Sequence, residues 1–222
     1  MYQAIIFDMD GVIVDSEPSH YKADTALFEK LGINLSDEER NSFLGVSSDE
    51  MWEYILDKYS LKYTKKELLE LDIEVRKKFL LTPNNPSVNP GLEALLQRIS
   101  QAGIPLAVAS SSIMDILEPL LKELVLTSYF KCFATGDLVL RAKPAPDVFL
   151  LAASMLTVEP ASCLVIEDSA NGIKAAKAAG MTCIAYSPVQ TQSNLSQADY
   201  IIKSFDEINL DLINSLYLKS LQ

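Results

Sequence analysis

The sequence has few of the residues that zinc sites and disulfide frameworks require. It contains one histidine, His20, and three cysteines, Cys132, Cys163 and Cys183, which are far apart and include no C-x-x-C pair. An odd number of scattered cysteines argues against a disulfide framework, and the lack of a histidine cluster argues against zinc. Because Cys163 and Cys183 lie in strand-like runs, we expect the cysteines to be buried free thiols.

Long apolar runs and an excess of basic residues are also missing. No run approaches the roughly 18 residues that span a bilayer. The first apolar run, residues 4–7, follows no basic segment and meets Asp8 at once. The 19 Lys and Arg against 30 Asp and Glu give a formal net charge of −11, which repels nucleic acid and anionic membranes alike. We therefore expect a cytoplasmic protein that binds neither nucleic acid nor a membrane.

The length and composition are those of a globular protein. The chain has 222 residues, of which 49% are hydrophobic and 22% are charged, so disorder is excluded as the dominant state. At about 150 residues per domain, this length suggests one large domain, or one domain that carries an insert.

Short apolar runs alternate with helical segments along much of the chain. The runs are at residues 3–7, 104–109, 162–166 and 182–186. They lack polar alternation, as expected of strands that helices cover on both faces of a parallel sheet. Helical patterns at residues 92–102 and 170–179 each end at a glycine, and another spans residues 147–155. This alternation predicts an α/β fold with a doubly wound parallel sheet.

Residues 16–82 break this alternation, because no β-branched run interrupts their helical periodicity. The helical patterns lie at residues 16–31, 49–59 and 67–80, the last opening with a capping-box Thr-x-x-Glu. The segment 82–90 contains three prolines and three asparagines, which indicates a connector. We predict an inserted helical bundle at residues 16–82 and one core domain formed by residues 1–15 and 83–222.

Carboxylates follow the first predicted strand directly. Asp8 and Asp10 are two residues apart, so on an extended chain their side chains point to the same side. Gly11 lets the backbone turn sharply beside them. Ligands of open α/β sheets bind at the carboxyl ends of the strands, so both carboxylates can face one site. The alternative is an acidic strand end solvated in a loop.

Glu167 and Asp168 stand at the end of the strand predicted at residues 162–166, so they approach the same edge of the sheet. Carboxylates held close together repel each other, which suits either a nucleophile with an acid–base partner or a metal site. Hard oxygen ligands without a histidine cluster favour magnesium over zinc. The cluster therefore predicts Mg²⁺ as the cofactor.

Lys143 and three serines are candidates for binding an anion at this edge. Lys143 begins Lys-Pro-Ala-Pro-Asp, where the prolines restrict the backbone, and a solvated surface lysine is the alternative. Ser110, Ser111 and Ser112 follow a predicted strand and precede a helical run. Their hydroxyls and the helix amides could hold an anion, with plain helix capping as the alternative for each serine.

Together these motifs resemble those of the haloacid dehalogenase superfamily of aspartate-nucleophile phosphotransferases, in the branch with a helical cap after the first strand. The resemblance covers nearly the whole chain. It includes four motifs in order: DMDGVIVDSEP at 8–18, VASSS at 108–112, KPAPDVF from 143, and VIEDSANG at 165–172. Each motif alone would be weak, but each lies at a strand end and the order matches. The resemblance implies a Rossmann-like α/β core with an inserted helical-bundle cap domain.

The resemblance also implies a mechanism. Asp8 would attack phosphorus and form an aspartyl phosphate, and Asp10 would protonate the leaving oxygen and then deprotonate the attacking water. Dehalogenases of the superfamily lack an acid at that position, so Asp10 indicates phosphoryl transfer. Mg²⁺ would be held by the carboxylates of Asp8 and Asp168 and the backbone carbonyl of Asp10. Glu167 would orient a water on the metal or add a ligand.

Phosphate contacts follow from the same resemblance. Lys143 and Ser110 would bind the transferring phosphoryl oxygens, where charge spreads in the transition state. Ser111 would add a contact through its backbone amide, Gly11 would lie against the phosphate, and Ser112 would cap the next helix.

Within the cap, the sequence departs from the mutases of this branch. The mutases present an arginine to the second phosphate of their substrate, just after a Gly-Val-Ser turn. In this chain the same turn, residues 45–47, is followed by Ser48. A serine hydroxyl cannot replace a guanidinium group in binding a phosphate. Arg76 could partly compensate, with an exposed basic helix face as the alternative. His20 could assist Asp10 or close the cap, with a partly buried helix residue as the alternative. We take His20, Ser48 and Arg76 as the candidate substrate-binding residues of the cap.

We therefore predict a monomeric, cap-gated, Mg²⁺-dependent phosphatase that acts on a small phosphorylated sugar or similar metabolite. The alternative is a hexose-phosphate mutase of the beta-phosphoglucomutase type. A third hypothesis, a binding protein on a degenerate scaffold, would require the loss of the nucleophile or the acid, and both Asp8 and Asp10 are present. A nucleotide-cofactor fold is disfavoured because neither G-x-G-x-x-G nor a Walker lysine loop occurs.

Overall fold

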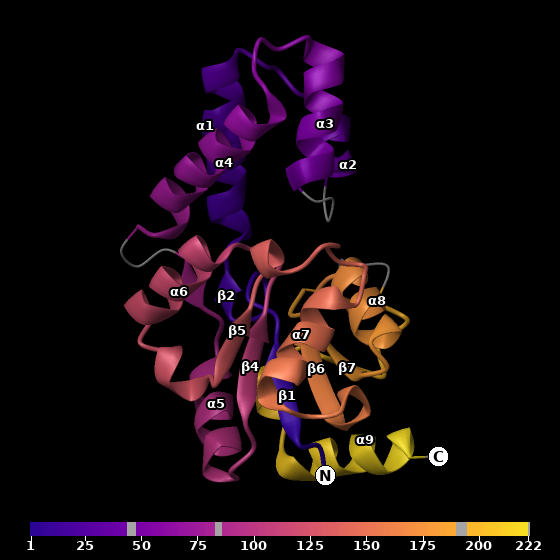
Figure 1. Ribbon diagram of the computed structural model, residues 1–222. Helices are drawn as coiled ribbons and strands as arrows, with labels where there is room; N and C mark the ends of the chain where they lie inside the picture. The colour runs from indigo at the N-terminus through magenta and orange to yellow at the C-terminus, as the bar shows by residue number, and fades with distance from the viewer. Residues whose placement is uncertain (44–47, 83–85, 190–194, 222) are drawn as a thin grey trace. The chain divides into compact units, whose positions relative to one another are not determined.

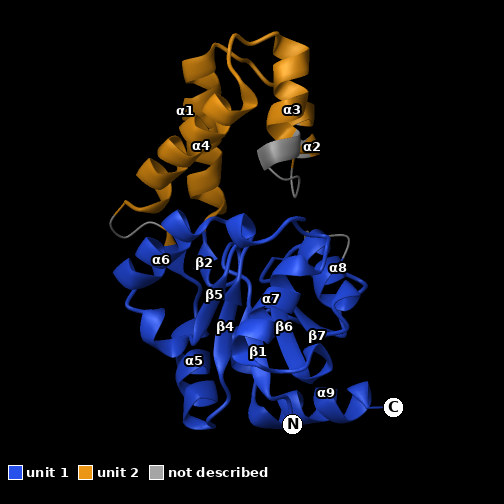
Figure 2. Cartoon of the chain, viewed as in Figure 1, with its two compact units in different colours: residues 1–15, 87–222 blue, residues 16–86 orange. Residues whose placement is uncertain are grey.

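The chain divides into two compact units. A computed structural model describes residues 1–43, 48–82, 86–189 and 195–221 (Figure 1). Unit 1 contains residues 1–15 and 87–222, and unit 2 contains residues 16–86 (Figure 2). The sequence predicts the second boundary after residue 82, whereas the division found here falls after residue 86.

Unit 1 is built on a six-stranded sheet in which neighbouring strands run parallel, in the order β5-β4-β1-β6-β7-β8. The strands are β1 (Ala4–Phe7), β4 (Leu106–Ala109), β5 (Cys132–Ala134), β6 (Cys163–Glu167), β7 (Thr182–Tyr186) and β8 (Tyr200–Ile202). After β1 the chain adds β4 and β5 on one side, then returns to add β6, β7 and β8 on the other. The predicted doubly wound parallel sheet is confirmed. Its reversal at β1 makes a switch point, where such folds bind ligands.

Helices flank this sheet, and both faces of β1 are buried. The α-helices of unit 1 are α5 (Leu92–Gln101), α6 (Met114–Glu123), α7 (Asp147–Leu156), α8 (Ala170–Ala178) and α9 (Leu210–Ser220). Ile6 of β1 belongs to one apolar cluster with Phe149 of α7 and Ile173 of α8. Phe7 points to the opposite face, where its ring lies 6.1 Å from that of Phe130 between centroids. Burial on both faces explains why the strand is apolar at every position.

A second sheet joins the two segments by which the chain leaves and re-enters unit 1. β2 (Val14–Asp15) and β3 (Ser87–Val88) pair antiparallel, with Val14 opposite Val88 and Asp15 opposite Ser87. β3 lies in the segment that the sequence indicates as a connector. Strands of two residues have no periodicity, so the sequence pattern does not predict them.

The apolar runs also fail to reveal β5 and β8, the two edges of the large sheet. Each has three residues, of which only the last is buried. Tyr200 and Ile201 of β8 are exposed. An edge strand with little buried surface lacks the continuous apolar run that marks the central strands.

The three cysteines are free thiols. Cys163 and Cys183 lie in β6 and β7 and are buried, as expected, but the expectation is wrong for Cys132, which is only partly buried. Cys132 lies in the edge strand β5, where less of the sheet and its helices covers it.

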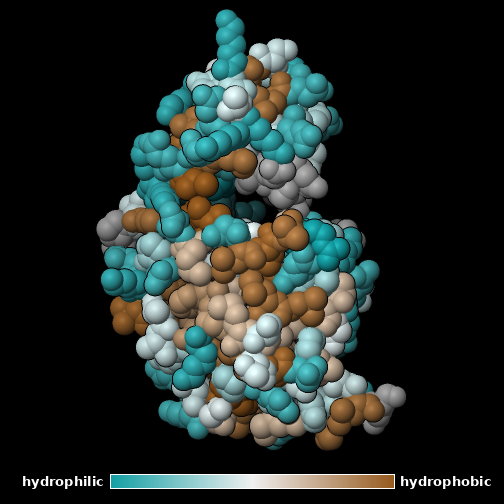
Figure 3. Space-filling view, viewed as in Figure 1, coloured by the Kyte–Doolittle hydropathy of each residue, from teal (hydrophilic) through white to brown (hydrophobic). Residues whose placement is uncertain are grey.

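Apolar side chains also reach the surface of unit 1. Figure 3 shows a brown band on the face that α7 covers. The exposed apolar residues of α7 and of the loop before it are Leu138, Leu140, Leu150 and Met155. α7 is therefore apolar on its outer as well as its inner side. None of the helices in the described ranges combines the length and hydropathy that a membrane span needs.

Apart from a bridge residue at Thr82, the described secondary structure of unit 2 is helical. Its helices are α1 (Glu17–Leu31), α2 (Asp37–Ser42), α3 (Ser48–Tyr59) and α4 (Lys65–Leu80). α1 ends at Gly32, which is left-handed with φ of 69°, and α4 begins with the predicted capping box between Thr64 and Glu67. The sequence pattern misses α2, whose six residues include no apolar side chain.

The core of unit 2 is built around its tryptophan. Trp52 of α3 and Leu68 of α4 are fully buried, and the Trp52 ring lies 5.9 Å from that of Phe28 between centroids. These residues belong to one apolar cluster that α1, α3 and α4 share. Tertiary packing therefore stabilises helices that would be marginal alone.

Leu68→Ala should destabilise unit 2. Removing this buried side chain leaves a cavity, which should lower the free energy of unfolding by about 2–5 kcal/mol. Urea unfolding followed by tryptophan fluorescence measures the change, since Trp52 is the only tryptophan. As a control, Leu140→Ala truncates a side chain that is 100% exposed and should change this free energy by less than about 0.5 kcal/mol. Equal free energies of unfolding for the Leu68→Ala and Leu140→Ala variants would contradict the described core of unit 2.

Candidate active site

Three neighbouring strands deliver polar residues to one edge of the large sheet. The last residue of β1 pairs with Val108 of β4 and with Ile166 of β6. Asp8, Ser110 and Glu167 lie one or two positions beyond these pairs, so they reach the carboxyl edge together. The parallel register thus assembles residues that are far apart in the chain.

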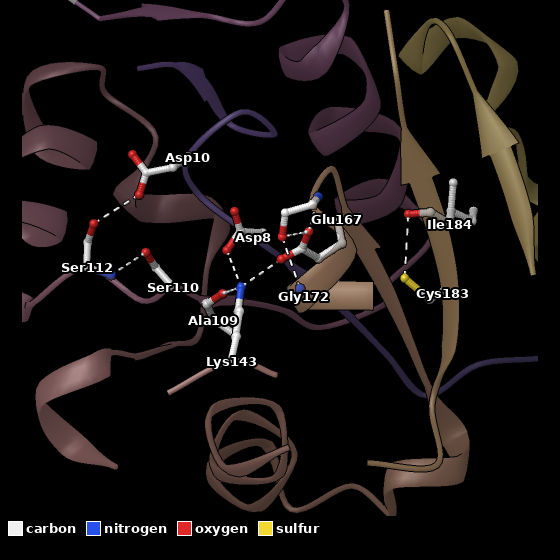
Figure 4. A network of polar contacts seen from close by, with 11 residues as sticks. Asp8, Asp10, Ala109, Ser110, Ser112, Lys143, Glu167, Gly172, Cys183 and Ile184 are labelled. Atoms are coloured by element: carbon white, nitrogen blue, oxygen red, sulfur yellow. Dashed lines mark hydrogen bonds and ion pairs between the residues drawn. The ribbon is translucent and has the colours of Figure 1, made fainter. Parts of the chain in front are cut away.

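Lys143 is the cation at this edge (Figure 4). Its Nζ donates to Asp8 Oδ1 at 2.5 Å, to Glu167 Oε1 at 2.9 Å and to the Ala109 carbonyl oxygen at 3.2 Å. The Lys143 side chain is only 7% exposed, unlike a solvated surface lysine. Burial by itself would lower the pKa of Lys143, but the carboxylates of Asp8 and Glu167 together outweigh burial and raise it. The ammonium group therefore stays protonated.

Glu167 is held through both of its oxygens. Besides the contact with Lys143, its Oε2 accepts from the Ser169 backbone N–H at 2.6 Å and from the Ser169 hydroxyl at 3.0 Å. Ser169 Oγ also caps α8 by accepting from the Gly172 N–H at 3.0 Å. A Cβ atom at Gly172 would lie 1.5 Å from Glu167 Oε1, so glycine is required. Neither Ser169 nor Gly172 is among the predicted site residues. The sequence signal that could identify Ser169 is a serine at the start of the helix that follows Glu167 and Asp168.

Carboxyl groups outnumber cationic groups among the described residues of this cluster. One oxygen each of Asp8, Glu167 and Asp168 lie within 4.8 Å of one another. Burial raises the pKa of Asp8 to about 7, an effect that Lys143 opposes and Glu167 increases. Burial likewise raises the pKa of Asp168 to about 9, and Glu167 and Asp8 add to this shift. One lysine cannot balance the two buried carboxylates and the partly buried one when all three are ionised, and hard oxygen donors in this number fit a divalent cation.

Gly11 lies directly against Asp168. Its φ is +80°, in the left-handed region, and a Cβ atom there would lie 2.1 Å from Asp168 Oδ2. The predicted sharp turn is therefore present, and glycine is needed for two reasons. It adopts this backbone conformation without strain, and it leaves room for the carboxylate.

Asp10 contacts the loop that follows β4 and contains Ser110, Ser111 and Ser112 (Figure 4). Ser112 Oγ donates to Asp10 Oδ2 at 2.9 Å, and the Ser112 N–H donates to Ser110 Oγ at 3.0 Å. Ser110 is fully buried, whereas Ser111 is exposed. Ser112 thus links the Asp10 carboxylate to the Ser110 hydroxyl.

The prediction that Ser112 caps α6 is wrong. The N-cap position belongs to Ile113, which makes no side-chain capping bond. Asp137 Oδ1 instead accepts from the Met114 N–H at 3.1 Å. The Ser112 hydroxyl turns toward Asp10, where a charged acceptor makes the stronger hydrogen bond.

Two predicted site residues of unit 2 contact each other. Arg76 Nη1 lies 2.9 Å from His20 Nδ1, its Nη2 donates to Asp24 Oδ1 at 2.8 Å, and its Nε forms an ion pair with Asp72 Oδ1 at 2.7 Å. The Arg76 side chain is 15% exposed, unlike an exposed basic helix face. All three guanidinium nitrogens are therefore engaged inside unit 2.

The turn at residues 45–47 lies outside the described residues, and so does the side chain of Ser48, whose backbone begins α3. The remaining predicted residues fall into two groups. Unit 1 brings together Asp8, Asp10, Gly11, Ser110, Lys143, Glu167 and Asp168, and unit 2 brings together His20 and Arg76. Ser111 also lies in unit 1, next to Ser110, and is exposed.

The chain matches the family of haloacid dehalogenase-like hydrolases over residues 5–186. It is 33% identical to the phosphorylated carbohydrates phosphatase of Thermotoga maritima, over 81% of this chain and 82% of that one. It is 32% identical to the beta-phosphoglucomutase of Bacillus subtilis, over 96% and 94% of the two chains. The structure of CbbY from Rhodobacter sphaeroides in complex with phosphate matches with a TM-score of 0.82 and 29% identity, covering 93% of this chain and 96% of that chain. The similar proteins thus include a phosphatase and a mutase.

Gly11→Ala should impair the binding of a divalent cation. The added Cβ atom displaces Asp168, so the variant should lose the rise in melting temperature that MgCl₂ gives the wild type. A cation at 100 times its Kd stabilises by about 2.7 kcal/mol, which makes the loss measurable by thermal unfolding.

Gly103→Ala is the matched control for this variant. Gly103 has a similar φ of +74°, but no atom lies within 4 Å of its Cβ position. Its substitution should cost roughly 1–2 kcal/mol of backbone strain and keep the magnesium-dependent rise. Equal rises in the two variants would contradict the contact between Gly11 and Asp168.

Proposed function

Since this chain belongs to the haloacid dehalogenase-like hydrolases, we propose that it is a Mg²⁺-dependent phosphatase of small phosphorylated metabolites, with sugar phosphates as the substrate class. The observation that carries the proposal is the pair Asp8 and Asp10 beside a cluster in which Lys143 pairs with Asp8 and Glu167, and oxygens of Asp8, Glu167 and Asp168 lie within 4.8 Å of one another. The similarity to a phosphatase of phosphorylated carbohydrates supports the substrate class. The monomeric state and the cytoplasmic location stay predictions.

Asp8 is the nucleophile of the first step. Its carboxylate oxygen attacks phosphorus, and the bond between phosphorus and the ester oxygen breaks. The ester oxygen keeps the electron pair and takes a proton from Asp10, so the products are an alcohol and an aspartyl phosphate. The ion pair with Lys143 favours the charged form of Asp8 that this step requires.

Asp10 acts as the base in the second step. It accepts a proton from a water molecule whose oxygen attacks the phosphorus of the aspartyl phosphate. The bond between phosphorus and Asp8 breaks, which regenerates the carboxylate and releases inorganic phosphate. Ser112 orients Asp10 for both steps by donating to its Oδ2.

Cationic and N–H groups bind the substrate phosphate. The carboxylates of Asp8, Asp168 and Glu167 and the backbone carbonyl of Asp10 would hold Mg²⁺, which would supply positive charge that offsets the repulsion of the nucleophile and the phosphate. Lys143, Ser110 and the backbone N–H group of Ser111 bind phosphoryl oxygens, and Gly11 lies against the phosphate. A protein with a net charge of −11 needs such local cations to attract an anionic substrate.

A hexose-phosphate mutase is the second candidate, favoured by the 32% identity to a beta-phosphoglucomutase. A mutase must hold a sugar with two phosphates, which requires a second cationic group. Ser48 stands where the mutases present an arginine, and the guanidinium of Arg76 already contacts His20, Asp24 and Asp72. These two observations favour hydrolysis.

Asp8→Asn should abolish phosphatase activity. An amide is not a competent nucleophile here, so kcat for p-nitrophenyl phosphate in MgCl₂ should fall by about 10³-fold or more. Asp211→Asn makes the same chemical change at an exposed position in the first turn of α9 and should leave kcat unchanged. The wild type in excess EDTA should be as inactive as Asp8→Asn. Wild-type rates in the Asp8→Asn variant would refute the mechanism.

A product analysis distinguishes hydrolysis from mutase chemistry. Given a panel of sugar phosphates that includes β-glucose 1-phosphate, the protein should release one inorganic phosphate for each ester consumed. Both phosphate and glucose 6-phosphate are measured in the same reaction. Accumulation of glucose 6-phosphate with little free phosphate would establish the mutase instead.

A further inference from the structure

Asn89 connects the segment that returns from unit 2 to the loop that follows Asp10. Its side-chain Nδ2 donates to the carbonyl oxygens of Gly11 and Val12, both at 2.9 Å. Its backbone N–H donates to the carbonyl oxygen of Ile13 at 3.0 Å. One residue, 8% exposed, therefore satisfies three consecutive carbonyl groups of a distant segment.

The carbonyl groups of residues 11–13 depend on the hydrogen bonds from Asn89, because N–H groups of the same loop donate to other carbonyl groups. The N–H groups of Gly11 and Ile13 donate to the carbonyl oxygens of Val14 and Met9, each at 2.8 Å. Val12 and Ile13 are fully buried, and a buried carbonyl group that loses its donor is destabilising. Removing the Asn89 amide should therefore shift or loosen this loop.

The same loop places two groups of the proposed reaction. Asp10 directly precedes Gly11, and Gly11 packs against the carboxylate of Asp168. β2 and β3 pair immediately after the loop and immediately before Asn89. A displacement at residues 11–13 is therefore transmitted to the Asp10 carboxylate.

We infer that Asn89 is a positioning residue for Asp10. Its side-chain amide fixes the backbone that follows Asp10, so that the carboxylate reaches the leaving oxygen of the substrate. The inference rests on the proposed phosphatase function. Because the Asn89 amide binds the backbone immediately after Asp10, its loss matters most in the step in which Asp10 donates a proton.

The leaving group distinguishes this role from a merely structural one. p-Nitrophenolate is stable enough to leave without a proton, whereas the alkoxide of a sugar phosphate requires one. The ratio kcat/KM reports the steps up to transfer of the phosphoryl group to Asp8, and so includes the protonation. A misplaced Asp10 therefore lowers kcat/KM for the sugar phosphate more than for p-nitrophenyl phosphate.

Asn89→Ala should lower kcat/KM by about 10- to 100-fold for the sugar phosphate that the wild type hydrolyses best, the usual effect of a misplaced catalytic group. The value for p-nitrophenyl phosphate should stay nearly unchanged. Asn89→Asp keeps the shape of the side chain but removes both N–H donors, so it should reproduce this selective loss even if the alanine variant folds poorly. Asn209→Asp is the matched control, because Asn209 accepts from the Leu212 N–H as the N-cap of α9 and aspartate accepts equally well.

Hydrogen exchange gives a second readout that does not depend on activity. Amides in a peptide covering residues 8–15 should exchange faster in Asn89→Asp than in the wild type, while those at residues 163–167 stay protected. Equal losses of kcat/KM on both substrates, or no loss, would overturn the inference. A wild type that hydrolyses neither substrate would refute the proposed function and the inference with it, and that result is seen without any variant.

Discussion

Lys143 is held between two carboxylates and a carbonyl group at the carboxyl edge of a parallel sheet, and the other parts of the site are arranged around this buried cation. Asp8 and Glu167 share its charge, and removing one partner from such a buried pair costs about 3–5 kcal/mol. The Ser169 N–H and hydroxyl satisfy the remaining oxygen of Glu167. Asp168 lies outside this pairing, and its pKa is raised to about 9, so its ionised form needs a further cation nearby.

The fold of unit 1 and the composition of its site could be predicted because their signals are local. Central strands covered on both faces give continuous apolar runs, and the residue after each run marks the carboxyl edge. Asp8, Ser110 and Glu167 are all found in this way, and the parallel register then brings them together. The edge strands β5 and β8 have no continuous apolar run, so the sequence pattern does not predict them.

Contacts between distant polar residues could not be predicted from the sequence. Ser112 and Asp10 are 102 residues apart, Asn89 and Gly11 are 78 apart, and Arg76 and His20 are 56 apart. A serine before a helix has the same sequence pattern whether its hydroxyl caps that helix or reaches across the site. The choice depends on which charged acceptor the fold places nearby, and only the three-dimensional structure contains that information.

The pairing of β2 with β3 also bears on how such proteins diversify. Because Val14 lies opposite Val88, the chain leaves and re-enters unit 1 at adjacent points. An insertion with adjacent ends can change in length or be exchanged without altering the order of the strands. Replacing this one continuous segment therefore leaves the strands that carry the proposed catalytic residues unchanged.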